Sequence, residues 1–336
     1  FAALMGVGAP SFASLGIAWV FVPAPFVYGY LWLRPPTTPW HRRAAVGYLV
    51  TSSILTAALL FGVAWIGSER ALHPNACDDL PELLEYPAVL RAVEPISFES
   101  ADGTRLSGWL LPGTRPEAVV LLHGYRCDRR EVLPHADMLY GAGFTVLLFD
   151  FRNRGGSEGD FVSLGFFERD DTQAAIDYLK SRTDVMSDGI GLLGISQGGA
   201  TAIMTAAASE DVDAVFAEAS FRSLDSAIAQ SFSHFIGLPA FPFAPITVWL
   251  AELKAGIRSE DIVPERVVRD VSPRPLLIAH GLDDETISPA DSEAIFAAAE
   301  EPKELWLIPG ADHGKGATTV PDEYRDRIVA FFDDNL

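Results

Sequence analysis

Acidic residues are missing from the first 68 positions of this 336-residue chain, and lysine and cysteine are scarce throughout. The only charged residues in that stretch are Arg34, Arg42 and Arg43, so the rest of the chain carries all 45 acidic residues against 22 basic ones. A surface this acidic repels the phosphates of nucleic acids, which argues against DNA or RNA as a partner. The amino-terminal fifth therefore differs in role from the remainder.

The two cysteines, Cys77 and Cys127, form neither a CxxC motif nor the spacing of metal ligands. The simplest interpretation is a pair of free thiols, and a single disulfide is the alternative if the domain lies in an oxidising compartment. We predict no metal site and no organic cofactor. The acidic runs at 78–85 and 168–171 are interpreted as solvated faces rather than as metal ligands.

Two long segments near the amino terminus contain no charged residue. Residues 44–66 are 23 uncharged positions, and about 20 residues cross a bilayer core as a helix. Tyr48 and Trp65 lie near the ends of this segment, as interfacial aromatic residues do. A buried core helix is the alternative, but core helices are usually shorter and amphipathic. The other segment, 15–33, has two prolines at its centre, which predict a kinked or broken span.

Residues 1–67 are therefore predicted to form a transmembrane helical hairpin. All three early arginines lie between the spans or at their edges, and the positive-inside tendency puts that link in the cytoplasm. The domain that follows the hairpin is then expected on the extracytoplasmic side of the cell membrane. Residues 68–92 are a linker to that domain.

Residues 93–336 alternate between short apolar runs and helical patterns. The runs at 96–100 and 105–111 are separated by a turn with Gly103, which predicts a β-hairpin. Apolar runs bounded by glycine or aspartate are typical of strands that are buried on both faces. The alternation predicts an α/β domain with a mostly parallel central sheet flanked by helices. The connection that contains residues 221–262 is longer than one crossover helix needs, and we predict that these residues form a small helical cap.

Ser196 lies in the sequence Gly-Ile-Ser-Gln-Gly, between a predicted strand and a predicted helix. This setting is that of a nucleophile elbow, in which a strained turn lifts the serine hydroxyl clear of the sheet. Glycines at 194 and 198 let neighbouring segments pass closely, and the helix amino terminus adds a positive dipole. The alternative is a purely structural Gly-Ser turn.

A serine nucleophile needs a base, and catalytic groups in an open α/β sheet gather beyond the carboxyl ends of the strands. Three of the seven histidines, His123, His280 and His313, follow such strands. His313, after the last strand, is the predicted base. His123 and His280 each precede a glycine at a strand end, and we interpret them as residues that hydrogen-bond to loop backbone.

The base needs a carboxylate to fix its tautomer, and the segment after the penultimate strand offers three acids at 283–285. Asp284 is the predicted partner, since Ser196, Asp284 and His313 follow the chain order expected of this arrangement. Glu218, at the end of an earlier strand, is the alternative.

With these motifs the region from about 90 to 336 resembles the α/β-hydrolase superfamily, and within it the bacterial membrane-associated lipase- or esterase-like serine hydrolases. The matching landmarks are LLHGY at 121–125, DFRNRGGS at 150–157, GISQGG at 194–199, and the HGLDD and GADHG segments. The family's H-G-x-x-D pattern places the acid on Asp284. The resemblance implies an oxyanion hole made by the backbone N–H groups of Tyr125 and Gln197.

The predicted activity is cleavage of carboxylic esters through an acyl-enzyme, on a small-molecule ester or lipid. A thioesterase, an amidase or peptidase and an acyltransferase share the same triad, and a non-catalytic, membrane-anchored lipid-binding module is a further alternative. Phe235, Phe241 and Trp249 in the cap are predicted to line the acyl pocket. Their alternatives are to seal the domain core or to dip into the bilayer.

Overall fold

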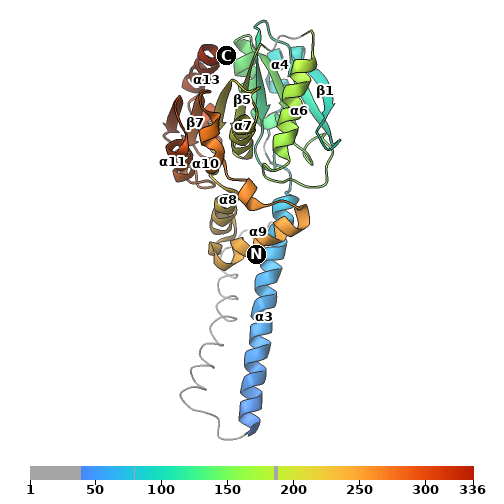
Figure 1. The fold of residues 1–336 in the computed structure, drawn as a ribbon, viewed down its shortest axis with the longest axis vertical. Helices are drawn as coiled ribbons and strands as arrows, with labels where there is room; N and C mark the ends of the chain where they lie inside the picture. Colours follow the sequence, from blue (N-terminus) through green and yellow to red (C-terminus); the bar gives the residue numbers. More distant parts are fainter. Residues whose placement is uncertain (1–38, 79, 185–187) are drawn as a thin grey trace. The chain divides into compact units, whose positions relative to one another are not determined.

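The computed structural model describes residues 39–78, 80–184 and 188–336 (Figure 1). The described chain divides into two compact units. The helical unit consists of residues 39–69 and 228–250, and the sheet unit consists of residues 70–227 and 251–336.

One long helix, α3 (Pro39–Leu72), dominates the helical unit. The described amino-terminal part is therefore a single helix and not the predicted hairpin, and the predicted span at 15–33 lies outside the described residues. The predicted span at 44–66 lies within α3. A stretch from Arg42 to Leu72 is long and apolar enough to cross a membrane, and only 11% of its most apolar window is buried. A core helix buries most of its apolar side chains, whereas this helix exposes most of them.

The remainder of the helical unit comes from the insertion between the sixth and seventh strands, which is helical as expected. It contains part of α8 (Leu224–Ser231), a π-helical turn at Phe232–Ile236 and most of α9 (Ala240–Ala255). Its small core packs two phenylalanines, Phe232 and Phe243, with Val63 of α3. The Thr247 hydroxyl donates to the carbonyl oxygen of Ala64 at 3.3 Å.

An eight-stranded sheet forms the centre of the sheet unit, in the order β1-β2-β4-β3-β5-β6-β7-β8. Strands β1 and β2 form the predicted hairpin, and β2 also pairs antiparallel with β4, while all other pairs are parallel. The predicted mostly parallel sheet is therefore confirmed. The strands are β1 (Glu94–Glu99), β2 (Arg105–Leu111), β3 (Glu117–Leu122), β4 (Thr145–Phe149), β5 (Gly189–Ile195), β6 (Ala214–Glu218), β7 (Leu276–Gly281) and β8 (Lys303–Ile308).

Helices cover both faces of this sheet, which explains why its central strands are apolar at nearly every position between their ends. In β3, Val120 packs in the core under α6, α7 and α11, and its neighbour Val119 packs in the core under α4, α5 and α13. These helices are α4 (Pro87–Ala92), α5 (Leu133–Gly141), α6 (Glu168–Ser181), α7 (Gln197–Ala208), α11 (Pro289–Ala298) and α13 (Pro321–Asn335). Short helical turns lie at Leu83–Glu85, Arg129–Val132, Ser259–Asp261, Pro264–Val267 (α10), Val268–Val271 and Gly316–Thr319 (α12).

Two interpretations of the sequence are wrong in the sheet unit. Cys77 and Cys127 form a disulfide, so they are not free thiols. The run at 168–171 is not simply a solvated face, because Glu168 and Asp171 are fully buried. Asp171 accepts hydrogen bonds from the guanidinium of Arg152, and Glu168 accepts from loop groups at 163–165, so each buried carboxylate has partners.

Candidate active site

Ser196 occupies a sharp turn between β5 and α7. Its φ is 55° and its ψ is −115°, a left-handed backbone conformation that is strained for any residue with a β-carbon. A β-carbon at position 194 would lie 2.2 Å from the carbonyl oxygen of Gly198, and one at position 198 would lie 2.1 Å from that of Leu122. Only glycine fits at either position, so the local sequence and the strained turn require each other.

The sheet brings the three residues of the expected triad together at the carboxyl ends of its strands. Ser196 follows β5, Asp284 follows β7 and His313 follows β8. The Oγ atom of Ser196 is 2.9 Å from Nε2 of His313, and Nδ1 of the same ring is 2.7 Å from Oδ2 of Asp284. Because Nδ1–H donates to the carboxylate, Nε2 remains as the acceptor for the serine hydroxyl.

Asp284 is buried and accepts hydrogen bonds on both oxygens. Oδ1 accepts from the backbone N–H groups of Thr286 at 2.8 Å and Ile287 at 2.9 Å. Oδ2 is 3.1 Å from Nε2 of His280 as well as 2.7 Å from His313. Burial alone would raise the pKa of Asp284, but the hydrogen bonds from the two histidines outweigh it and hold the pKa well below its usual value. The carboxylate therefore stays ionised at neutral and mildly acidic pH.

The other candidate acids do not contact the His313 ring. Asp283 is exposed. Glu218 is fully buried, where its Oε1 accepts from the N–H of Gly316 at 2.9 Å and its Oε2 accepts from the Tyr324 hydroxyl at 2.5 Å. Burial raises the pKa of Glu218. The imidazole of His313 is thus held by Asp284, while Glu218 holds the loop that carries the imidazole.

The loop after β3 carries Tyr125, and a network beneath it fixes its backbone. Nδ1–H of His123 donates to the carbonyl oxygen of Gly124 at 2.8 Å, and Nε2 accepts from the N–H of Phe151 at 3.0 Å. Burial lowers the pKa of His123, which fits the neutral ring that these contacts need. The N–H of Gly124 donates to the half-buried Glu131 at 2.5 Å. Gln197 is the first residue of α7, where the N–H has no partner within the helix.

Some supporting residues were foreseen and others were missed. His123 and His280 hold loops as expected. Asp150 accepts from the N–H groups of Arg129 and Gly156 and so stabilises the loop that follows β4. The contact of His280 with Asp284, and the contact of Glu131 with Gly124, had no signal in the sequence, because each depends on how a loop turns back on residues shortly before it.

The predicted pocket residues lie in the helical unit. The side chains of Phe235, Phe241 and Trp249 are 50%, 79% and 51% exposed. This exposure excludes one alternative, that these aromatic rings seal a domain core. Their part in an acyl pocket stays a prediction.

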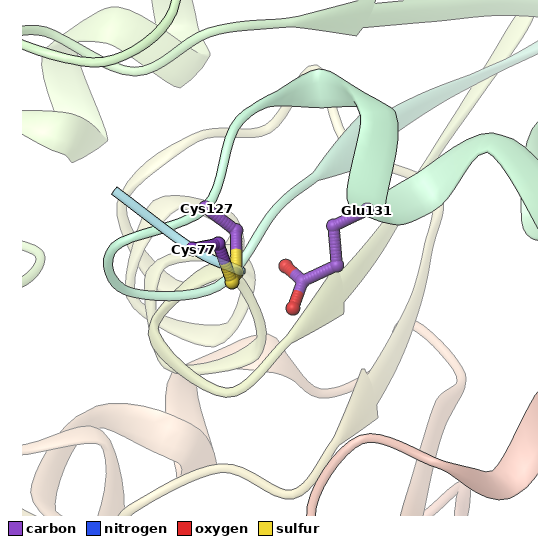
Figure 2. Close-up of side chains that lie close together, drawn as sticks. All are labelled: Cys77, Cys127 and Glu131. Carbon is purple, nitrogen blue, oxygen red and sulfur yellow. A yellow bond between two sulfur atoms is a disulfide. The ribbon is translucent and has the colours of Figure 1, made fainter. Parts of the chain in front are cut away.

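Among the described residues, one group has the composition of a metal site. Sulfur and carboxylate atoms of Cys77, Cys127 and Glu131 lie within 4.8 Å of one another (Figure 2). Both sulfurs belong to the disulfide, so neither is a thiolate ligand in this state.

Comparisons with known proteins relate this chain to a protein family, to two relatives and to a solved structure. Residues 97–234 match the family model of the X-Pro dipeptidyl-peptidases of the S15 family. The chain is 31% identical to the uncharacterised protein YfhR of Salmonella typhimurium, over 75% of this chain and 85% of YfhR. It is 29% identical to the uncharacterised protein YqkD of Bacillus subtilis, over 70% of this chain and 77% of YqkD. Among solved structures, the Pyrococcus furiosus esterase Pf2001 aligns with a TM-score of 0.63 at 23% identity, covering 78% of this chain and 97% of that one.

This chain belongs to the α/β-hydrolase superfamily. At 23% identity, the likeness to the esterase establishes the fold and does not by itself assign a substrate. The resemblance drawn from the sequence motifs is therefore confirmed at the level of the superfamily.

Proposed function

We propose that this α/β-hydrolase is a serine hydrolase that cleaves carboxylic esters. The observation that carries the proposal is the unbroken hydrogen-bond chain from Ser196 Oγ through His313 to the ionised Asp284. Each of the three residues follows a different strand. A nucleophile, a base and an orienting acid in hydrogen-bonding contact form the arrangement of a catalytic site, and a structural cluster has no need of it.

The geometry supports a two-step reaction. Ser196 Oγ attacks the ester carbonyl carbon while its proton passes to Nε2 of His313. The backbone N–H groups of Tyr125 and Gln197 stabilise the resulting oxyanion, and the helix dipole of α7 adds to this effect. His313 then gives its proton to the departing alkoxide, which leaves as the alcohol. In the second step His313 takes a proton from water, and the resulting hydroxide adds to the acyl carbon. The bond to Ser196 then breaks, His313 returns the proton to Ser196 Oγ, and the carboxylic acid is released.

Two observations bear on the substrate class. The structural neighbour Pf2001 is an esterase, which favours an oxygen ester. The excess of acidic residues on the chain disfavours strongly anionic substrates, so neutral esters are favoured over acyl-CoA. The match of residues 97–234 to the S15 model favours a peptidase as the second candidate, since the same triad also cleaves amides.

A substrate panel with the purified protein separates these functions. We expect turnover of p-nitrophenyl esters to exceed that of acyl-CoAs and of X-Pro p-nitroanilides by at least tenfold in kcat/KM. A preference for the X-Pro anilides would replace the esterase by the peptidase. A fluorophosphonate probe should label Ser196, and a chain that neither reacts with the probe nor turns over any substrate would be the non-catalytic module.

We also propose that α3 anchors the enzyme in the cell membrane, with the sheet unit on the extracytoplasmic side. Support comes from the exposed apolar surface of α3, from Arg42 and Arg43 at its start, and from the Cys77–Cys127 disulfide, which persists in oxidising compartments. Protease added to intact spheroplasts should digest the sheet unit while a cytoplasmic marker survives. Digestion only after lysis would place this unit in the cytoplasm.

The predicted contribution of the insertion to acyl-chain selectivity has its own test. Each buried CH₂ group contributes about 0.8 kcal/mol, so two further carbons that fit would raise kcat/KM roughly tenfold. Phe235→Ala and Trp249→Ala should shift the preferred chain length without lowering the unfolding temperature. Leu253→Ala is the control, since this exposed side chain lies on the same helix α9. An unchanged chain-length profile in both variants would show that these rings do not line the acyl pocket, and insertion into the bilayer would remain as their role.

A further inference from the structure

The loop that carries Tyr125 is attached to one other segment by three consecutive residues. That segment is 70–77, which begins with the last turn of α3 and ends at Cys77. Both the loop and the segment belong to the sheet unit. The attachment therefore connects the end of the long helix to the proposed oxyanion hole.

Tyr125 makes the first attachment through its phenol. The hydroxyl donates to the carbonyl oxygen of Arg70 at 2.6 Å and lies 3.1 Å from that of Ala71. Carbonyl groups in the last turn of a helix have no partner within the helix, so the phenol takes the place of water at the end of α3. Burial raises the pKa of this phenol, which keeps it protonated and able to donate.

The next two residues make the second and third attachments. The guanidinium of Arg126 donates to the carbonyl oxygens of Asn75 and Ala76, both at 3.3 Å, and its own carbonyl oxygen accepts from the N–H of Cys77 at 3.1 Å. Cys127 is bonded covalently to Cys77. Arg126 has a φ of 73°, a left-handed conformation that a non-glycine residue keeps only where its surroundings enforce it.

Glu131 holds the start of the same loop. Its carboxylate accepts from the N–H of Gly124, and Figure 2 shows the side chain directed toward the two sulfur atoms of the disulfide. Position 124 is thus fixed by Glu131 and positions 125–127 by segment 70–77. The peptide N–H of Tyr125 lies between these two sets of contacts.

We propose that segment 70–77 is a positioning element for the oxyanion hole, acting through the phenol of Tyr125 and the Cys77–Cys127 disulfide to aim the Tyr125 N–H. This inference rests on the proposed function. A transition-state donor must be held close to its working geometry, because a displacement near 1 Å removes on the order of 10²-fold in rate. The side chain of Tyr125 is then a positioning group, and its backbone is the group that touches the substrate.

Tyr125→Phe tests this without removing the N–H or the aromatic ring. We expect kcat on the best ester to fall about tenfold with KM unchanged, since an oxyanion donor acts in the transition state only. The affinity for a trifluoromethyl ketone, to whose carbonyl carbon Ser196 adds to give a stable oxyanion, should fall by the same factor. Tyr178→Phe is the control, because it removes a tyrosine hydroxyl of α6 that accepts a hydrogen bond from Arg182 at 2.9 Å, and it should change neither quantity.

Removal of the disulfide by Cys77→Ala with Cys127→Ala should give the same pattern, as should mild reduction of the wild-type protein. Titration of Ser196 with a fluorophosphonate gives the fraction of folded enzyme, so kcat is counted per folded site. If ester hydrolysis persists and both variants keep wild-type kcat and ketone affinity, segment 70–77 does not position the oxyanion hole. If wild-type protein fails to hydrolyse any ester and resists the probe, the proposed function itself is wrong.

Discussion

Ser196→Ala is expected to abolish hydrolysis, with kcat lower by about 10⁴- to 10⁶-fold, as typically follows loss of a triad nucleophile. The variant should keep the unfolding temperature of the wild type. Alanine has the same β-carbon, so it neither relieves nor increases the strain at φ 55°. The hydroxyl that it removes contacts His313 at a site that is nearly closed to solvent. Kinetics on p-nitrophenyl esters and a thermal melt measure both effects.

Ser209→Ala supplies the control for this experiment. Ser209 lies at the other end of α7, where its hydroxyl accepts from the N–H of Asp211. This variant should be fully active. A Ser196→Ala protein that kept more than a tenth of the wild-type turnover would show that the nucleophile lies elsewhere.

Asp284→Asn should lower kcat on the order of 10⁴-fold. The asparagine oxygen can still accept from the N–H groups of Thr286 and Ile287, which turns its NH₂ group toward His313. An NH₂ group cannot accept a hydrogen bond from Nδ1–H, so the ring carries its hydrogen on Nε2 and accepts from the NH₂ group at Nδ1 instead. The imidazole then has no lone pair for the Ser196 hydroxyl, and the base is lost although the fold is kept.

Two further variants decide between the candidate acids. Asp283→Asn changes the exposed neighbour of Asp284 and should leave kcat unchanged. Glu218→Gln keeps an acceptor for Gly316 and is expected to retain most of the activity, since Glu218 holds the loop and not the ring. Near-normal turnover by Asp284→Asn together with an inactive Glu218→Gln would reverse the assignment of the acid.

The strands and the elbow could be predicted because their signals are local. A continuous apolar run as long as β3 or β5 predicts a strand that is buried on both faces, even when its neighbouring strands are unknown. The turn at Ser196 needs glycines at 194 and 198 for reasons of backbone contact, so the motif and its geometry are bound together. The order of Ser196, Asp284 and His313 along the chain then follows from the order of the strands.

Features that depend on distant segments could not be predicted in this way. Asp171 can be buried because it pairs with Arg152 from the loop after β4. The sequence at 168–171 gives no sign of this pairing, so it has the pattern of an exposed acidic face. The disulfide also joins distant residues, because its two cysteines are 50 residues apart and nothing local in the sequence indicates that they meet. A contact between near neighbours in the chain can also depend on the fold, since His280 reaches Asp284 only because the loop after β7 turns back on its own strand.

The backbone of the elbow also says something about selection. At φ 55° and ψ −115° a glycine would relieve roughly 1–3 kcal/mol of conformational strain, and positions 194, 198 and 199 around it are already glycine. A chain selected for stability alone would carry glycine at 196 too. Serine at position 196 makes the fold less stable than glycine would. Selection for stability therefore does not explain this serine, and selection for the chemistry of its hydroxyl group does.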